Sequence, residues 1–367
     1  MLLAITTGKR KNAMTDSYKN ILNEFIQKNQ TYIVIPSAYD QEEFSDKFKF
    51  KIKETFSCNN KIIALFQSMS FAYKLRKIVK QNGIIRIFLY FDNDWFNIIL
   101  NIFLINTKVD YFVWIHDPIL HSGEGIITKT VRLFNEKFLY RKAKKIFISW
   151  EGIKGVVADR YKIGQEKIVS IKLPEMAETQ FSDIIPSDSD KCLYDILFFG
   201  RIESYKGINL LIDTILYLEQ SGRLLRTVIG GTGSIEKEVA KSINGHSNII
   251  FINKYIENRK LAELISVSKI VVLPYKDATG TLAIQTANFY NKPVIASNVG
   301  CFSEYIENGV NGFIFDQYTV DDLANKIFYL LENRSLYQKM QQKMPYYFKK
   351  NFNLKTMAHK LEKEIQI

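Results

Sequence analysis

Cysteine, histidine and proline are scarce in this chain of 367 residues, which contains three, four and seven of them. The cysteines Cys58, Cys192 and Cys301 lie far apart and form no Cys-x-x-Cys pair. Neither a disulfide framework nor a zinc ribbon is therefore expected, and a reducing cytoplasm fits this cysteine usage best.

Long hydrophobic runs are also missing. The longest apolar stretch, residues 95–105, is interrupted by Asn97 and Asn101, and it is shorter than the ~20 residues that a membrane-spanning helix needs. Residues 1–10 lack the apolar segment of a signal peptide. We therefore expect a protein without an integral membrane segment.

The composition is that of a globular protein, with 47% hydrophobic residues, 13% aromatic residues and 18 glycines. These values exclude a disordered or collagen-like chain. At roughly 100 to 200 residues per domain, the length predicts two domains, each large enough to bury its own core.

The formal net charge of +12 is distributed unevenly. Residues 1–186 hold 28 Lys and Arg against 19 Asp and Glu, whereas the remainder holds 22 against 19. An anionic membrane surface or a nucleic acid would attract such a basic half, and a solvated lysine-rich surface explains it equally well. No nucleic-acid recognition motif accompanies the charge, so a nucleic-acid partner is not expected.

Short β-branched or aromatic runs alternate with longer amphipathic runs in both halves, which predicts βα units and parallel sheets. In the first half we expect strands at residues 31–36, 61–66, 84–90, 111–115, 145–149 and 167–171. Helical spacing covers residues 71–81, 95–105 and 126–142.

The same alternation restarts after residues 173–191, where periodicity is lost and prolines and serines accumulate as in a linker. Strands are expected at residues 195–199, 226–230, 248–252, 269–274 and 293–296. Helices are expected at residues 207–219, 235–242, 258–266, 282–290 and 320–332. Residues 346–367 are basic and amphipathic, and this last helix could pack back on the first domain or cap the second.

The strongest local motif lies between a predicted strand and a predicted helix. Gly200 ends the strand and lets backbone approach a ligand, and Arg201 and Lys206 place two cations beside the helix N-terminus. This arrangement suits a diphosphate. The alternative is a surface turn with two solvated cations.

Two further polar turns follow predicted strands. The turn Gly230-Gly231-Thr232-Gly233 lacks the Gly-Lys-Ser/Thr ending of a phosphate-binding P-loop and the later acid of a dinucleotide fingerprint. In residues 274–282, backbone N–H groups and the hydroxyls of Thr279 and Thr281 could face an anion or a sugar. Either threonine could instead be an ordinary helix N-cap.

In this order the motifs resemble the donor-binding domain of the retaining GT-B glycosyltransferases of family 4, of the bacterial surface-polysaccharide type. The resemblance covers about residues 195–331 and continues through Lys292-Pro293, Gly300, Glu304 and residues 307–313. In the first half, Trp114-Ile115-His116-Asp117-Pro118 and residues 121–124 resemble the His-Asp-Pro loop of bacterial members.

The resemblance implies a GT-B fold, in which two Rossmann-like, doubly wound α/β domains face each other across a cleft. Residues 1–180 would be the acceptor-side domain, 181–191 the linker and 192–345 the nucleotide-sugar-binding domain. The implied enzyme is a retaining, hexosyltransferase-type glycosyltransferase (EC 2.4) without cofactor or metal. It would transfer a sugar from a nucleotide diphosphate sugar to a hydroxyl of a lipid-linked or growing surface glycan, in the cytoplasm at the inner face of the membrane.

The resemblance also implies roles for individual residues. His116 would be catalytic, reaching toward the donor sugar, although a structural histidine remains an alternative, and a metal pair with His121 has no supporting ligand spacing. Arg201 and Lys206 would bind the diphosphate, and the backbone of Ile256 would lie near the base. The other donor-binding residues would be Gly200, Gly231, Gly233, Thr279, Gly280, Thr281 and Thr286.

One departure from the family pattern concerns its two glutamates, which are separated by seven residues. Aligning the chain between Pro274 and Pro293 places Ala278 and Thr286 at these positions, and a shifted alignment would place Asp277 and Gln285 there. Contacts to the donor's hydroxyls would then come from Thr279, Thr281 and Thr286 or from Asp277 and Gln285. The missing glutamates leave open a catalytically silent relative that binds a nucleotide sugar or glycan as a partner subunit.

Overall fold

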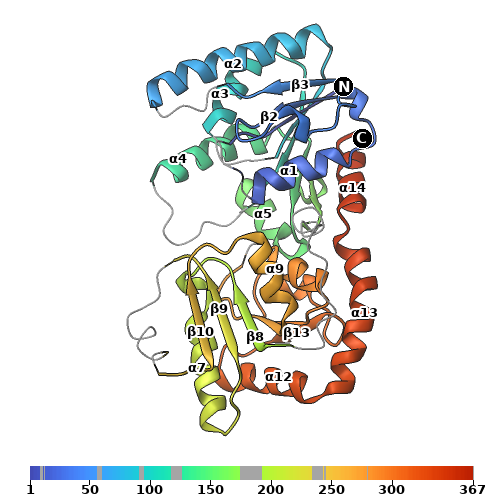
Figure 1. Ribbon diagram of the computed structural model, residues 1–367. Coiled ribbons are helices and arrows are strands. Elements are labelled where there is room, and N and C mark those ends of the chain that lie inside the picture. The colour runs from blue at the N-terminus through green and yellow to red at the C-terminus, as the bar shows by residue number, and fades with distance from the viewer. Residues whose placement is uncertain are drawn as a thin grey trace. The chain divides into compact units, whose positions relative to one another are not determined.

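The computed structural model divides the chain into two compact units (Figure 1). Unit 1 comprises Met1–Lys172 and Leu354–Ile367, and unit 2 comprises Leu173–Asn353. The predicted linker at 181–191, the predicted helix at 235–242 and Cys58 lie outside the residues that the structure describes. Those are residues 1–8, 11, 13–55, 60–90, 95–116, 126–173, 192–233, 243, 245–278 and 280–366.

Unit 1 is built on a seven-stranded sheet whose order is β3-β2-β1-β4-β5-β6-β7, with every neighbouring pair parallel. Its strands are β1 (Leu2–Ile5), β2 (Thr31–Ile35), β3 (Phe50–Lys53), β4 (Arg86–Leu89), β5 (Asp110–Trp114), β6 (Lys145–Ile148) and β7 (Ile168–Ser170). Its helices are α1 (Ala13–Asn23), α2 (Lys61–Gln81), α3 (Trp95–Leu104), α4 (Ile126–Asn135), the π-helix η3 (Glu136–Tyr140), α5 (Lys154–Tyr161) and α14 (Leu354–Gln366).

The core of unit 1 follows the two-residue period of its strands. Leu3, Ile5 and Val34 point to one face of the sheet, where they pack with Phe71 of α2 and Phe96 of α3. The intervening residues are buried on the opposite face, because the central strands are covered on both sides. This double burial explains why the strands read as nearly continuous apolar runs.

Unit 2 repeats the plan with a six-stranded parallel sheet in the order β10-β9-β8-β11-β12-β13. Its strands are β8 (Tyr194–Phe199), β9 (Thr227–Gly231), β10 (Ile249–Asn253), β11 (Ser268–Leu273), β12 (Val294–Ser297) and β13 (Gly312–Phe315). Its helices are α7 (Ile208–Gln220), α9 (Asn258–Ser266), α10 (Ala283–Phe289), α11 (Phe302–Tyr305), α12 (Val320–Glu332) and α13 (Arg334–Phe352). The expectation of two doubly wound α/β domains is confirmed.

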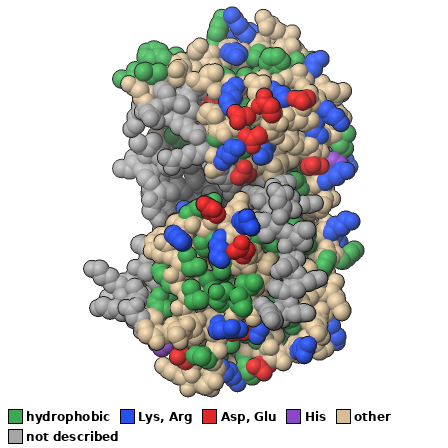
Figure 2. All heavy atoms as spheres, in the orientation of Figure 1, with side chains coloured by type: hydrophobic (Ala, Val, Ile, Leu, Met, Phe, Trp, Pro, Cys, Tyr) green, Lys and Arg blue, Asp and Glu red, His purple; other side chains and the backbone are tan. Residues whose placement is uncertain are grey.

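The surface carries both signs of charge. Figure 2 shows Lys and Arg side chains interspersed with Asp and Glu over much of the face in view. Among the described helices, none combines the length and the apolar character needed to cross a membrane.

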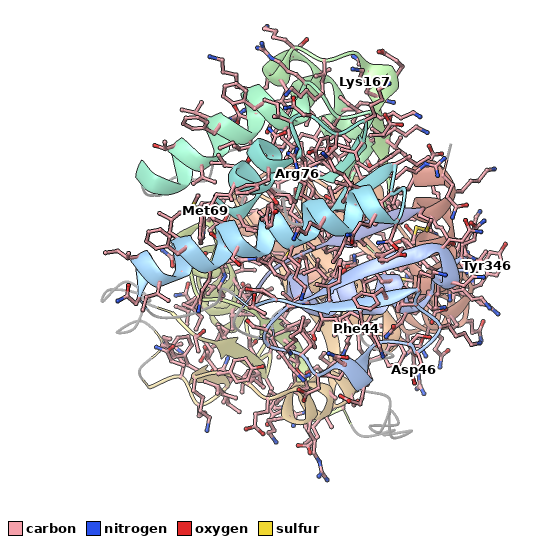
Figure 3. The ribbon with its side chains drawn as sticks, turned by 90° about the horizontal axis from the view of Figure 1, so that it is seen from above. Phe44, Asp46, Met69, Arg76, Lys167 and Tyr346 are labelled. Atoms are coloured by element: carbon pink, nitrogen blue, oxygen red, sulfur yellow. The ribbon has the colours of Figure 1, made fainter. Side chains whose placement is uncertain are left out.

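The strand expected at residues 61–66 is wrong, because these residues form the first turns of α2, which runs from Lys61 to Gln81 (Figure 3). The side chain of Asn60 caps this helix by accepting hydrogen bonds from the backbone N–H groups of Ile62 and Ile63 at 3.0 and 3.2 Å. A short apolar run cannot by itself distinguish a strand from a helix.

The single helix expected over residues 346–367 is instead two. Helix α13 ends at Phe352, Asn353 is extended with φ −61° and ψ 121°, and α14 begins at Leu354. Helix α13 belongs to unit 2, whereas α14 belongs to unit 1 and packs against α1.

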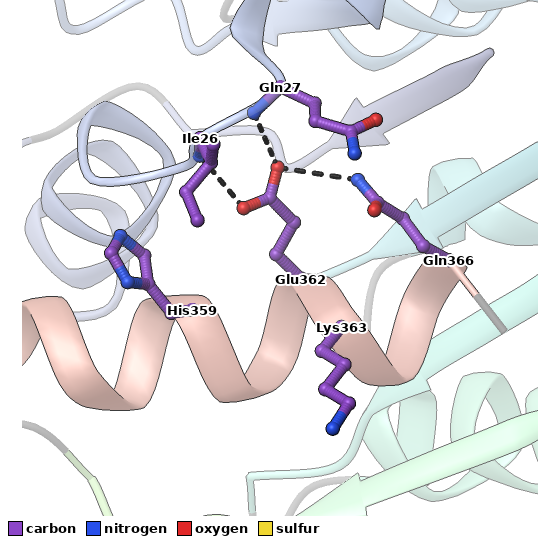
Figure 4. Close-up of a pocket in the computed structure, with 6 residues that line it drawn as sticks. All are labelled: Ile26, Gln27, His359, Glu362, Lys363 and Gln366. Atoms are coloured by element: carbon purple, nitrogen blue, oxygen red, sulfur yellow. Dashed lines mark hydrogen bonds between the residues drawn. The ribbon is translucent and has the colours of Figure 1, made fainter.

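Helix α14 is fastened to unit 1 by a buried carboxylate. Glu362 is 3% exposed and accepts hydrogen bonds from the backbone N–H groups of Ile26 and Gln27, both at 2.7 Å (Figure 4). One turn earlier, His359 Nε2 lies 3.1 Å from the carbonyl oxygen of Glu24. A pocket of about 280 Å³ lies between α14 and the segment after α1. It is lined by Ile26, Gln27, His359, Glu362, Lys363 and Gln366.

The substitution Glu362→Gln is expected to destabilise the protein by roughly 1.5 to 3 kcal/mol. The neutral amide loses the charge assistance of these hydrogen bonds, and its NH₂ group would face one of the two backbone N–H donors. The control is Glu364→Gln on the same helix, whose partly exposed ion pair with Lys145 (2.5 Å) should contribute under about 1 kcal/mol. Urea unfolding of both variants measures the difference, and equal effects would contradict a special role for Glu362.

Candidate functional site

The predicted donor-binding residues of unit 2 lie at the point where the strand order reverses. From β8 the chain proceeds outward through β9 and β10, and it then returns to β11 on the other side of β8. Gly200 follows β8, and Pro274 follows β11. Doubly wound sheets bind their ligands outside the carboxyl ends of the strands at such a switch point.

The glycines after β8 and β9 allow these two strand ends to touch. A Cβ atom on Gly231, whose φ is +156°, would lie 1.6 Å from the carbonyl oxygen of Gly200. A Cβ atom on Gly233 would lie 1.9 Å from the carbonyl oxygen of Ile202, with which Gly233 forms a parallel bridge. Both positions therefore require glycine for packing, and their contact with a nucleotide stays a prediction.

Lys206 is held in place by the turn that connects β8 to α7. The turn is a 3₁₀ segment, Ser204–Lys206, and it ends at Gly207, whose φ is +68°. A Cβ atom at Gly207 would lie 1.7 Å from the carbonyl oxygen of Pro274, so the turn sits directly against the end of β11. The ammonium of Lys206 lies 3.8 Å from the centre of the Tyr275 ring.

Lys206 and Arg201 form an electropositive pair. Burial, and then the neighbouring guanidinium of Arg201, lower the pKa of Lys206 to about 8, whereas Glu203 acts in the opposite direction. Arg201 is 71% exposed and forms an ion pair with Glu203 at 3.0 Å. Because the guanidinium of Arg201 disfavours the protonated form of Lys206, a bound dianion at this position would favour the ammonium form of Lys206.

The affinity for a nucleoside diphosphate is therefore expected to fall as the pH rises through about 8. In the protein without nucleotide, Lys206 loses its proton near that pH. Only the ammonium form donates charge-assisted hydrogen bonds to phosphate. A Lys206→Arg variant, which stays charged, should show a flat profile up to a pH of about 9. Titration calorimetry across this range tests the assignment, and a wild-type profile as flat as that of the variant would contradict it.

Tyr275 was not singled out by the sequence. Its ring is 2% exposed and lies between Lys206 and Phe302, whose ring centre is 5.1 Å away. Burial raises the pKa of Tyr275, and the hydroxyl of Thr281 hydrogen-bonds to its phenol oxygen. Tyr275 therefore joins the turn that carries Lys206 to the loop after β11.

Thr281 and Thr286 already form hydrogen bonds within the protein. Thr281 Oγ1 accepts a hydrogen bond from the backbone N–H of Ala283 at 3.1 Å, but the N-cap position of α10 is Leu282, so Thr281 is not the N-cap residue. Thr286 donates to the carbonyl oxygen of Leu282 at 2.9 Å, so its proton is engaged within α10. Gly280 is half-buried in the same loop, and Thr279 lies outside the described residues.

The alternative pair, Asp277 and Gln285, lies in two different environments. Asp277 is exposed, whereas Gln285 is fully buried and donates from Nε2 to the carbonyl oxygen of Leu173 at 3.1 Å. Ala278 is buried, and a Cβ atom on Gly300 would lie 1.6 Å from its carbonyl oxygen.

Ile256 lies between β10 and α9. Its side chain covers the end of β9, since a Cβ atom on Gly230 would lie 2.4 Å from Ile256 Cδ1. The contact fixes the loop that carries Ile256, and the contact of its backbone with a base stays a prediction.

In unit 1, His116 lies two residues beyond β5, at the carboxyl edge of the sheet. Its Nε2 lies 2.8 Å from the carbonyl oxygen of Tyr90, the residue that follows β4. A carbonyl only accepts, so Nε2 carries the proton. The ring also contacts those of Tyr90 and Trp114, with centres 4.9 and 5.8 Å apart, which fixes its orientation. His121 lies outside the described residues.

A buried acid at the same edge was missed by sequence reasoning. Glu54 follows β3, is 3% exposed and accepts hydrogen bonds from the backbone N–H groups of Gly8 and Ser37 at 3.0 and 3.1 Å. It thereby ties the ends of β1, β2 and β3 together. Among the described residues, no three His, Cys, Asp or Glu side chains are grouped to hold a metal ion.

Comparison with known proteins agrees with this fold. The family described as Glycosyl transferases group 1 matches residues 182–347. A relative named alpha-D-kanosaminyltransferase, from Streptomyces kanamyceticus, is 22% identical over 59% of this chain and 58% of its own. The chain spans about half the length of the curated relatives it matches.

Solved structures match over the entire chain. A glycosyltransferase from Rickettsia africae has a TM-score of 0.72 and 18% identity, covering 100% of this chain and 98% of its own. HepE from Anabaena, in complex with UDP and glucose, also has a TM-score of 0.72, with 14% identity, covering 100% and 99%. The chain thus has the GT-B fold of these glycosyltransferases, and residues 182–347 match glycosyl transferases group 1.

Proposed function

We propose that this protein transfers a sugar from a nucleotide diphosphate sugar to a hydroxyl group of a lipid-linked or growing surface glycan. The observation that carries the proposal is the Arg201–Lys206 pair at the β8/β11 switch point, within the segment that matches glycosyl transferases group 1. The structural neighbour bound to UDP and glucose supports a donor of this chemical class.

The proposed reaction breaks the bond between the anomeric carbon and the diphosphate oxygen and forms a bond to the acceptor oxygen, with retention of configuration. The nucleoside diphosphate leaves, and the acceptor hydroxyl loses its proton. Negative charge grows on the leaving diphosphate, so preorganised cations stabilise the transition state. Arg201 and Lys206 provide two such charges at the site, and this supports a reaction that proceeds without a metal.

The proposed working place is the inner face of the membrane, where a lipid-linked acceptor would be found. Arg201, Lys206 and Gly200 would hold the diphosphate, with Gly231, Gly233 and Ile256 toward the nucleoside. Gly280 and the threonines of the β11–α10 loop would lie toward the sugar. His116 would act in the transfer step.

The test is a thermal-shift screen of UDP-, GDP-, ADP- and TDP-sugars, followed by a transfer assay with the donor that binds. A ligand at about a hundred times its dissociation constant stabilises the native state by about 2.7 kcal/mol, which gives a clear rise in melting temperature. Failure of every donor to raise it would reject the proposal. Binding without turnover on any acceptor would favour the silent partner subunit instead.

A further inference from the structure

A tyrosine from a distant loop reaches the turn that carries Lys206. Tyr318 lies between β13 and α12, and its hydroxyl donates a hydrogen bond to the carbonyl oxygen of Pro274 at 2.8 Å. A Cβ atom on Gly207 would meet both this hydroxyl and that carbonyl oxygen, so the three groups are packed against one another. The hydroxyl of Tyr318 therefore lies where the end of β11 meets the start of α7.

The loop that carries Tyr318 is itself well anchored. The carboxylate of Asp322 accepts hydrogen bonds from the backbone N–H groups of Asp316 and Gln317 at 3.0 and 2.9 Å. In return, the side chain of Thr319 caps α12 by accepting a hydrogen bond from the backbone N–H of Asp322 at 3.3 Å. Because the residues on both sides of it are fixed, Tyr318 can support its partner rather than follow it.

The segment that this hydroxyl holds leads directly into Tyr275. The carbonyl group of Pro274 belongs to the peptide group that joins it to Tyr275. In the next peptide group, the carbonyl oxygen of Tyr275 accepts a hydrogen bond from the hydroxyl of Ser297. The N–H of Lys276 donates to the carbonyl oxygen of Tyr205, in the turn between β8 and α7, at 2.7 Å. The end of β11 and the turn are therefore joined directly, and the bond to Pro274 supports the same junction from another loop.

The position of the Lys206 ammonium depends on this junction. It lies 3.8 Å from the centre of the Tyr275 ring and 4.9 Å from the centre of the Tyr205 ring. The first ring follows β11, whereas the second belongs to the turn after β8. A change in the spacing of these two segments would therefore alter the surroundings of the ammonium.

The pKa of Lys206 reports on these surroundings. Burial is the largest cause of its lowered pKa of about 8. Besides the two tyrosine rings, the titratable groups that act on it are Arg201, which lowers the pKa, and Glu203 and Cys301, which raise it. Because burial dominates, better access of water to the ammonium would raise the pKa.

We propose that Tyr318 is a positioning residue for the donor diphosphate, because its hydrogen bond keeps Lys206 in place over the Tyr275 ring. The single hydroxyl hydrogen of Tyr318 is used by Pro274, so none is left to donate to a phosphate oxygen. Burial raises the pKa of Tyr318 to about 12, so this hydrogen is retained at neutral pH. The role in donor binding rests on the proposed function, whereas the effect on Lys206 is measured without nucleotide.

The first measurement is the pKa of Lys206 in the protein without nucleotide. NMR titration of protein with isotope-labelled lysine side chains follows the ammonium, and Lys206→Ala identifies its signal. The Tyr318→Phe variant keeps the ring but lacks the hydroxyl, so the junction should loosen and admit water. The pKa of Lys206 is then expected to rise from about 8 toward the ordinary lysine value of 10.5.

The second measurement is the affinity for UDP, GDP, ADP and TDP, by titration calorimetry. Tyr318→Phe is expected to bind the preferred nucleotide about fivefold more weakly at neutral pH, the usual effect of one lost hydrogen bond. The pH at which the affinity falls should also move above about 8, following the pKa of Lys206. In a Lys206→Ala background, Tyr318→Phe should cause no further loss, because its effect passes through the ammonium.

The matched control is Tyr337→Phe. The hydroxyl of Tyr337 donates to the carbonyl oxygen of Lys269 at 2.7 Å, near the opposite end of β11. Each variant loses one hydrogen bond between a tyrosine hydroxyl and a backbone carbonyl, so their melting temperatures should fall by similar amounts. Only Tyr318→Phe should change the pKa of Lys206 or the affinity for the nucleotide.

Two results would overturn the proposal. One is an unchanged pKa of Lys206 in folded Tyr318→Phe, or an equal rise in Tyr337→Phe, which would make Tyr318 an ordinary structural residue. The other is an equal loss of nucleotide affinity in the Lys206→Ala background, which would show that Tyr318 acts independently of Lys206. A raised pKa in Tyr318→Phe, combined with a wild type that binds none of the four nucleotides, would support the positioning of Lys206 and reject the proposed function instead.

Discussion

Replacement of Lys206 by alanine is expected to weaken the binding of a nucleoside diphosphate by about tenfold to a hundredfold. A charge-assisted hydrogen bond contributes roughly 1.5 to 3 kcal/mol, and every 1.4 kcal/mol is about tenfold in affinity. Lys206 is already positioned over the Tyr275 ring at 3.8 Å, so little side-chain freedom is lost on binding. The free nucleotide should lose as much affinity as the sugar donor, because the contact is to the diphosphate.

Arg201→Ala should have a smaller effect, since Arg201 is 71% exposed and already paired with Glu203. Calorimetric titration with the nucleotide identified by the donor screen gives both values. Lys254→Ala, which removes an exposed lysine between β10 and α9, controls for the general loss of positive charge. A folded Lys206→Ala variant with wild-type affinity would remove the diphosphate assignment.

Replacement of His116 by alanine is expected to lower kcat by about tenfold or more while leaving nucleotide affinity nearly unchanged. His116 belongs to unit 1, and its ring is fixed by the carbonyl oxygen of Tyr90 at 2.8 Å. A hydrogen bond of about 1.5 kcal/mol that forms only in the transition state is worth about tenfold in rate. Such a loss lowers kcat and kcat/KM together.

The matched control for this prediction is His359→Ala, which removes another histidine whose Nε2 lies near a carbonyl oxygen, that of Glu24 at 3.1 Å. Steady-state transfer with the true acceptor is measured for wild type and both variants. Equal kcat values for wild type and His116→Ala would make His116 a structural histidine.

Most elements of unit 2 could be predicted because short apolar runs alternate there with amphipathic runs of helical spacing. Helices α9 and α12 begin and end at the predicted residues, β8 begins one residue earlier than predicted, and β9 is displaced by one residue. Strand β13 was not predicted. Unit 1 was harder, and neither its central strand β1 nor its edge strand β3 was predicted. Only one of the four residues of β3 is buried, so its alternation of apolar and polar residues is too short to predict a strand. The apolar residues at the start of α2 resembled a strand.

The cations of the candidate site could be predicted because a glycine turn between a strand and a helix is a local signal. The contacts that position them could not, since they join segments distant in sequence. Tyr275 supports Lys206 from 69 residues away, and Glu54 holds Gly8 from 46 residues away. For Gly231 and Gly233, the packing requirement became visible only when β8 and β9 were side by side.

The attachment of α14 to unit 1 also sets the order in which the protein can be completed during synthesis. Residues 173–353 of unit 2 are continuous, whereas unit 1 needs residues 354–366, which the ribosome adds after unit 2. Until Glu362 emerges, the backbone N–H groups of Ile26 and Gln27 lack their carboxylate partner. Synthesis of unit 1 therefore starts before that of unit 2 but is completed after it. A nascent chain that already contains all of unit 2 still exposes the side of α1 that α14 covers.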